Sequence, residues 1–159
     1  MQFDESPMAV VARHQKEPPV MLGPIAKELG VKVTRLPLGK AIAGQIMRDP
    51  LKGGSSGFSI LINSDDAMNR QKFTLAHELA HFILHRDLIE SGIIDDTMYR
   101  SELGSTYETQ ANQLAADILM PIRLVKKWRL IEPDPKELAK RFDVSEQAMK
   151  IRLSGMVPV

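Results

Sequence analysis

The chain has 159 residues, of which 43% are hydrophobic and 26% charged, a composition typical of a globular domain and unlike that of a disordered chain. With 21 Lys and Arg against 20 Asp and Glu, the net charge of +1 gives no global reason to expect nucleic acid or an anionic membrane as a partner. The absence of cysteine excludes thiol catalysis, disulfides and thiolate-bound metal, so a metal site would use histidines and carboxylates.

The first sixty residues predict two short helices followed by a small sheet. Residues 7–16 and 22–29 have helical patterns, and Gly30 after the second is a typical helix-stop residue. Alternation of apolar and polar residues, or a short apolar run, then predicts strands at residues 31–36, 43–47 and 58–62. The Gly/Ser loop before the last strand is typical of a hairpin, so we expect a small antiparallel sheet.

Two longer helices are predicted in the middle of the chain. Acidic residues open the first at Asp65, and an apolar stripe at helical spacing, which includes Leu84, continues it through His85. The second covers residues 107–119 and ends before Pro121, because the residue before a proline avoids the helical conformation. The connection between them has mixed polarity and predicts no regular element. The two helices can therefore face each other.

The last forty residues predict a helical tail. Helical patterns cover residues 122–130 and 136–142, and a third helix capped by Ser145 runs to about Leu153. The last two helices have the outline of a helix-turn-helix. No apolar run is long enough to span a bilayer, and the acidic start of the sequence is unlike a secretory signal, so we expect a cytoplasmic protein with no membrane partner.

The histidines carry the most specific chemical signal in the sequence. His77 and His81 are four residues apart in the sequence HELAH, so on a helix they project from one face and can bind one ion. Zinc suits this pair, and a catalytic zinc site takes a third protein ligand and keeps one position for water. Glu78 would lie beside the ion and act as general base. The alternative is an ordinary amphipathic helix, with Glu78 on its surface and the histidines hydrogen-bonded in the core.

The third ligand must come from elsewhere in the chain. Glu108 on the next predicted helix is our choice, and Asn112, one turn further on, could orient a ligand. Asp117 is the competing acid, but a surface position on the same helix explains it better. His85 is disfavoured as a ligand because one helix cannot easily bring three successive turns, each about 5.4 Å long, onto one ion, and we expect it to support a ligand or to be structural. Asp87 stands where a metzincin would have its third histidine, which disfavours that class.

Two stretches of the sequence resemble the ImmA/IrrE family of metallopeptidases. They are RQKFTLAHELAH at residues 70–81, followed by His85, and ETQANQLAADILMP at residues 108–121. The order of these motifs and the gap between them suit the family. The tail at residues 137–153 also looks like the family's helical region, so the resemblance covers most of the chain after its first helix.

The resemblance implies both a site and a substrate. The zinc ligands would be His77, His81 and Glu108, and Glu78 would be the catalytic base, the same four residues that the spacing indicates. Family members typically cleave a helix-turn-helix repressor, and others act beside such regulators in toxin-antitoxin-like pairs. The expected function is therefore zinc-dependent hydrolysis of a peptide bond in a partner protein, either a transcriptional repressor or an antitoxin.

The resemblance and the patterns together predict an α+β fold with two parts. Residues 1–121 would form a zincin-like metallopeptidase domain, in which the small antiparallel sheet packs on the helix pair of the active site. Residues 122–159 would form a helix-turn-helix-like tail packed on that domain.

Other functions are open at this point. The chain could be a non-proteolytic toxin or a regulator-binding module that keeps the peptidase scaffold, with its tail touching DNA. Such contacts would come from the basic side chains of Lys140, Arg141, Lys150 and Arg152. The net charge gives DNA contact no support, and a solvated face explains these cations as well. Tyr99 and Tyr107 are candidate phenol donors to a reaction intermediate, although two ordinary half-buried tyrosines explain them equally.

Overall fold

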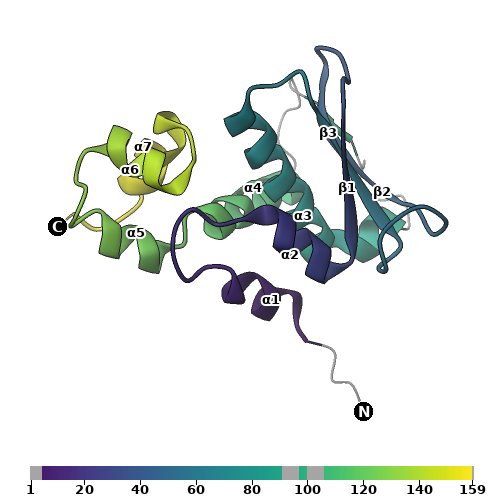
Figure 1. Cartoon of the computed structure of the whole chain (residues 1–159), viewed down its shortest axis with the longest axis horizontal. Helices are drawn as coiled ribbons and strands as arrows, with labels where there is room; N and C mark the ends of the chain where they lie inside the picture. The colour runs from purple at the N-terminus through teal and green to yellow at the C-terminus, as the bar shows by residue number, and fades with distance from the viewer. Residues whose placement is uncertain (1–4, 91–96, 100–105, 159) are drawn as a thin grey trace.

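A small sheet lies at one end of the chain's α+β fold (Figure 1). The computed structural model describes residues 5–90, 97–99 and 106–158, and in this part four strands form one sheet in the order β1-β3-β2-β4. The strands are β1 Val31–Leu36, β2 Ile42–Arg48, β3 Phe58–Asn63 and β4 Thr97–Tyr99. β1 runs parallel to β3, whereas β2 runs antiparallel to both β3 and β4.

The sheet is mixed rather than antiparallel, which corrects one part of the predicted fold. β2 and β3 form the expected hairpin, but β1 lies on the far side of β3 instead of beside β2. The connection from β1 to β2 therefore crosses the end of β3, where the buried Asn63 holds it. The Asn63 side chain donates to the carbonyl oxygens of Gly39 and Ile42 at 2.7 and 2.8 Å and accepts from the Leu38 N–H at 3.1 Å. Alternation of apolar and polar residues predicts that a segment is a strand. It does not predict which other strand that segment pairs with.

Every predicted helix is present, with bounds that differ from the prediction by a few residues. The helices of the described part are α1 Pro7–Arg13, α2 Leu22–Leu29, α3 Met68–Glu90, α4 Thr106–Leu119, α5 Ile122–Trp128, α6 Pro135–Phe142 and α7 Glu146–Ser154. Ser145 caps α7 as expected, since its hydroxyl accepts from the Ala148 N–H at 3.0 Å. No helix in this part is both long and apolar enough to cross a membrane.

The long helix α3 is the central element of the molecule. It begins at Met68 rather than at Asp65, and one residue inside it, His85, has non-helical angles of φ −129° and ψ 20°. Residues 74–82 are all buried, so this part of the helix is covered on every side and not only along an apolar stripe. Leu84, which the stripe includes, is 47% exposed and departs from the prediction. A helix buried all round has no polar face, which explains why amphipathic spacing describes it poorly.

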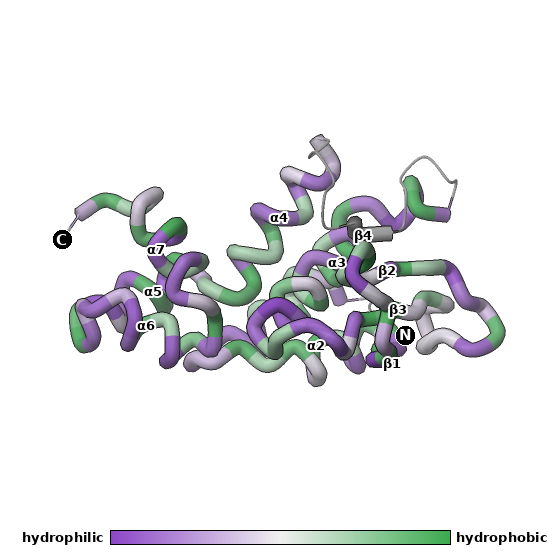
Figure 2. The backbone as a smooth tube through the Cα atoms, turned by 90° about the horizontal axis from the view of Figure 1, so that it is seen from above, coloured by the Kyte–Doolittle hydropathy of each residue, from purple (hydrophilic) through white to green (hydrophobic). Residues whose placement is uncertain are grey.

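The C-terminal helices lie at the opposite end from the sheet, with α3 and α4 between them, and the view from above shows the same order (Figures 1 and 2). One hydrophobic cluster runs through all three regions. Its members include Ile60 of β3, Leu79 of α3, Ile118 of α4 and Phe142 of α6, each at most 1% exposed. The site described below therefore rests on a scaffold whose parts share one core.

Glycine at position 44 sets the distance between β2 and α3. A Cβ at Gly44 would lie 2.6 Å from Cγ2 of Thr74 and 2.9 Å from the carbonyl oxygen of Leu61. Both distances are shorter than van der Waals contact allows. Any larger residue at position 44 would push α3 away from the sheet.

We predict that Gly44→Ala lowers the free energy of unfolding by about 1–3 kcal/mol, because a side chain forced into a packed interior strains its neighbours. Urea denaturation followed by circular dichroism measures this change. Gly23→Ala is the matched control, since a Cβ at Gly23 on α2 would have nothing within 4 Å. Equal stability of the two variants would contradict the close approach of β2 and α3.

Candidate metal centre

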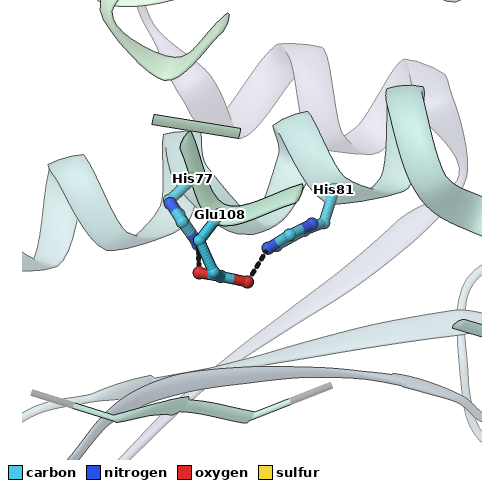
Figure 3. A group of neighbouring side chains, drawn as sticks. All are labelled: His77, His81 and Glu108. Carbon is cyan, nitrogen blue, oxygen red and sulfur yellow. Dashed lines mark hydrogen bonds and ion pairs between the residues drawn. The ribbon is translucent and has the colours of Figure 1, made fainter. Parts of the chain in front are cut away.

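Three side chains converge between α3 and α4. His77 and His81, one turn apart on α3, are 1% and 3% exposed. Glu108, in the first turn of α4, places Oε2 2.9 Å from Nε2 of His77 and Oε1 2.8 Å from Nε2 of His81 (Figure 3). The three ligand atoms lie within 4.8 Å of one another. Among the described residues, this is the only such group of metal-ligating side chains.

The packing of α3 against α4 brings these residues together. The two helices contact each other closely, and small residues on both are fully buried, including Ala76 and Ala80 on α3 and Ala111 and Ala115 on α4. Side chains of this size let two helix axes approach. The helical spacing of 77 and 81 then places both imidazoles on one face, toward the first turn of α4.

Asn112 fixes the orientation of His77. Its Oδ1 lies 2.7 Å from Nδ1 of His77, in the position that the sequence predicts for a residue that orients a ligand. An amide oxygen only accepts hydrogen bonds, so Nδ1 of His77 donates the proton. A neutral ring in this tautomer keeps its lone pair on Nε2, the atom that faces Glu108.

The charge states also suit a cation site. Burial lowers the pKa of His81 and so favours its neutral form, although its hydrogen bond with Glu108 acts in the opposite direction. Burial raises the pKa of the Glu108 carboxyl, but hydrogen bonds with His77 and His81 outweigh this effect and lower the pKa to about 2. Near neutral pH Glu108 is therefore a carboxylate, held between the Nε2 atoms of His77 and His81.

A metal ion fits this donor set. Lone pairs that converge in a buried place repel one another unless a proton or a cation lies between them. Two imidazole nitrogens and a carboxylate oxygen are common zinc ligands, and three protein ligands leave one position open. Cysteine is absent from the sequence, and the three converging side chains offer only nitrogen and oxygen donors.

The other predicted residues have different surroundings. Glu78 lies between the two histidines in sequence and is 1% exposed, so a surface position for this residue is wrong. Asp117 is bound to Arg152 at 2.8 Å near the other end of α4, and Asp87 is exposed. Tyr107 packs its ring edge-on against His85 with 5.2 Å between centroids. The side chain of Tyr99 lies outside the described residues.

His85 contacts a proposed ligand, as its expected supporting role requires, whereas the sequence analysis assigned no role to Gln110. His85 lies behind His81, with 2.9 Å between the two Nδ1 atoms, and its Nε2 lies 2.7 Å from Oε1 of Gln110. The spacing of four between His81 and His85 signals the first contact. No sequence signal identifies Gln110, because its role depends on how α4 lies along α3.

A buried helix with two histidines one turn apart, facing a carboxylate from a neighbouring helix, has the ligand arrangement of metallopeptidase domains. Residues 26–154 match the sequence model of the IrrE N-terminal-like domain, and the chain belongs to this family, as the resemblance to ImmA/IrrE peptidases predicts. The match covers α3 and α4 and continues through the C-terminal helices.

Curated relatives carry the same family name. The chain is 38% identical over 104 residues to the radiation response metalloprotease IrrE of Deinococcus radiodurans, covering 63% of this chain and 32% of that protein. It is 40% identical over 91 residues to the protein of the same name from Deinococcus deserti, covering 54% of this chain and 32% of the relative. The aligned region thus spans about a third of the length of these relatives.

A solved structure shares the fold. A Mycobacterium tuberculosis transcriptional regulator superposes with a TM-score of 0.56 at 19% identity, covering 96% of this chain and 47% of that chain. At this level of identity the similarity concerns the fold alone.

We predict that purified wild-type protein contains about one zinc ion per chain, and that His81→Ala and Glu108→Ala each lose most of it, because either change removes one of three ligands. Elemental analysis after gel filtration measures the metal. Asp87→Asn, which changes an exposed acid on α3, serves as the control and should retain zinc. Equal zinc in all four proteins would place the metal somewhere else.

Proposed function

We propose that the chain is a zinc-dependent endopeptidase that hydrolyses a peptide bond in a partner protein. The observation that carries this proposal is the convergence of His77, His81 and Glu108 within 4.8 Å, beside a buried glutamate in the HELAH sequence. Membership of the IrrE N-terminal-like family supports it, as do relatives named as metalloproteases. The alignment covers only about a third of these relatives, so we propose the activity from the residues of this chain.

The roles of the residues follow from their chemistry. His77, His81 and Glu108 would hold the ion, and Asn112 would keep His77 in the required tautomer. When bound, zinc supplies a Lewis acid that polarises the substrate carbonyl and lowers the pKa of water toward about 7. The carboxylate of Glu78 would take a proton from the attacking water and deliver it to the leaving nitrogen.

The sheet offers a place for the substrate chain. β1 and β4 are the two edges of the sheet in the described part, and an extended peptide can add to such an edge through backbone hydrogen bonds. This mode of binding would hold the peptide backbone in an extended form. Side chains on either side of the cleaved bond would then determine specificity.

The proposed substrate is a helix-turn-helix repressor or an antitoxin, because the ImmA/IrrE peptidases that the motifs resemble typically act on such regulators. A substrate that binds DNA would place the reaction in the cytoplasm. We also propose that residues 1–121 act as the peptidase domain and residues 122–159 as a tail packed on it. Leu124, Leu138 and Phe142 of the tail belong to the same core cluster as α3, which supports that packing.

The structure gives DNA contact by the tail no support. The four cations that would touch phosphates each have an acidic partner in the chain: Lys140 with Glu137, Arg141 with Glu132, Lys150 with Glu146 and Arg152 with Asp117. The N–O distances lie between 2.8 and 3.3 Å. Such pairing reduces the positive potential that a phosphate backbone would meet. These four cations therefore do not form the free basic stripe typical of DNA-binding helices.

We predict that Glu78→Gln lowers the rate of substrate cleavage by at least about 100-fold, because an amide cannot accept the proton from water. The zinc content should stay that of the wild type, since Glu78 is not among the proposed ligands. Cleavage is measured by co-expression with regulators encoded beside the gene, followed by mass spectrometry of the fragments.

Glu90→Gln is the matched control for this experiment, because it makes the same change at an exposed position on α3. It should cleave at the wild-type rate. Undiminished cleavage by zinc-loaded Glu78→Gln would rule out the proposed role of this residue.

A further inference from the structure

A chain of hydrogen bonds lies behind His81, on the side away from Glu108. Nδ1 of His81 is 2.9 Å from Nδ1 of His85, and Nε2 of His85 is 2.7 Å from Oε1 of Gln110. His85 belongs to the next turn of α3, and Gln110 belongs to α4. These hydrogen bonds thus connect the two helices of the candidate metal centre without using a proposed ligand atom.

The side-chain oxygen of Gln110 determines the direction of these hydrogen bonds. The Gln110 oxygen only accepts, so Nε2 of His85 carries the proton and donates it. A neutral imidazole with this proton has its lone pair on Nδ1, so His85 accepts from Nδ1 of His81. His81 then carries its proton on Nδ1 and directs the lone pair of Nε2 toward Glu108.

The surroundings of His85 hold it in this arrangement. The residue is 4% exposed, and its backbone angles interrupt the helical geometry of α3. Its ring lies 5.1 Å from that of His81 and 5.2 Å from that of Tyr107, measured between centroids. A buried ring keeps these partners, whereas an exposed ring would exchange them with water.

We propose that His85 and Gln110 are positioning residues that hold His81 in the Nδ1-protonated tautomer and so raise the affinity of the site for zinc. This inference rests on the proposed zinc site. Each proposed histidine ligand then has its own oxygen acceptor on α4. Asn112 reaches His77 directly, whereas Gln110 reaches His81 through His85. Partners of this kind fix the ring orientation and the tautomer of a ligand.

Zinc affinity tests the proposal, because the tautomer of His81 affects zinc binding directly. This measurement needs no known substrate. Gln110→Leu removes the acceptor at an exposed position and should weaken zinc binding about tenfold. Gln110→Glu keeps an acceptor and should restore affinity close to that of the wild type. Gln113→Leu makes the same apolar change at another exposed position of α4 and should leave affinity unchanged. Competition with a chromophoric zinc chelator measures all four proteins.

Nitrogen-15 spectra of the histidine rings give a second readout that simple packing would not change. In zinc-loaded wild type we expect protons on Nδ1 of His81 and on Nε2 of His85, and a shift of both signals in Gln110→Leu but not in Gln113→Leu. A proton on Nδ1 of His85 in the wild type would overturn the proposal. So would an unchanged zinc affinity in Gln110→Leu.

The same zinc-affinity measurements distinguish failure of this proposal from failure of the proposed function. Below, the hydrogen bonds from His81 through His85 to Gln110 are called the relay. Tight zinc binding by the wild type that Gln110→Leu leaves unchanged overturns only the relay. A wild type that binds no zinc, while its circular dichroism shows a folded chain, overturns the proposed zinc site and the relay with it.

Discussion

The burial of the middle of α3, where residues 74–82 are all buried, is the constraint on which the rest of the structure depends. Four of its side chains, His77, Glu78, His81 and His85, are at most 4% exposed, although each is polar or ionisable. Moving such groups out of water is unfavourable unless partners replace the lost hydrogen bonds. The helix can occupy the centre of the molecule only because the neighbouring helix supplies those partners to its histidines.

The first two turns of α4 supply the hydrogen-bond partners of the buried histidines from alternate positions. Glu108 faces both proposed histidine ligands, Gln110 binds His85, and Asn112 binds His77. On the same helix, Ala111, Ala115 and Ile118 are fully buried. One end of α4 therefore satisfies the polar side chains of α3, while the rest packs into the core. The site is a consequence of how two helices match along their length, and the same contacts determine stability and chemistry.

The sequence predicted the fold class, the helices and the pair His77 and His81 from local patterns, and it predicted Glu108 as the acid on the next helix. Helical spacing places two histidines on one face whatever surrounds them. The parallel pairing of β1 with β3 was not predictable in this way, since it depends on how Asn63 holds a loop that is distant in sequence. The exposure of Leu84 and the contact between His85 and Gln110 also escaped prediction. Both depend on the rotation and tilt of one helix against another, which no periodicity encodes.

The far end of α4 explains why the C-terminal helices belong with the site. Arg152 of α7 donates to the Met120 carbonyl oxygen at 2.9 Å and to Asp117 at 2.8 Å, and Gln15 donates to the carbonyl oxygens of Asp117 and Ile118 at 3.0 Å. These side chains satisfy carbonyl groups that a helix end leaves without intrahelical partners. They hold the C-terminal end of α4 in place. Because the helix is rigid, its other end, with Glu108, is held in place as well. The family match runs through residue 154 and so includes α7, whose Arg152 contacts the end of the helix that supplies the carboxylate.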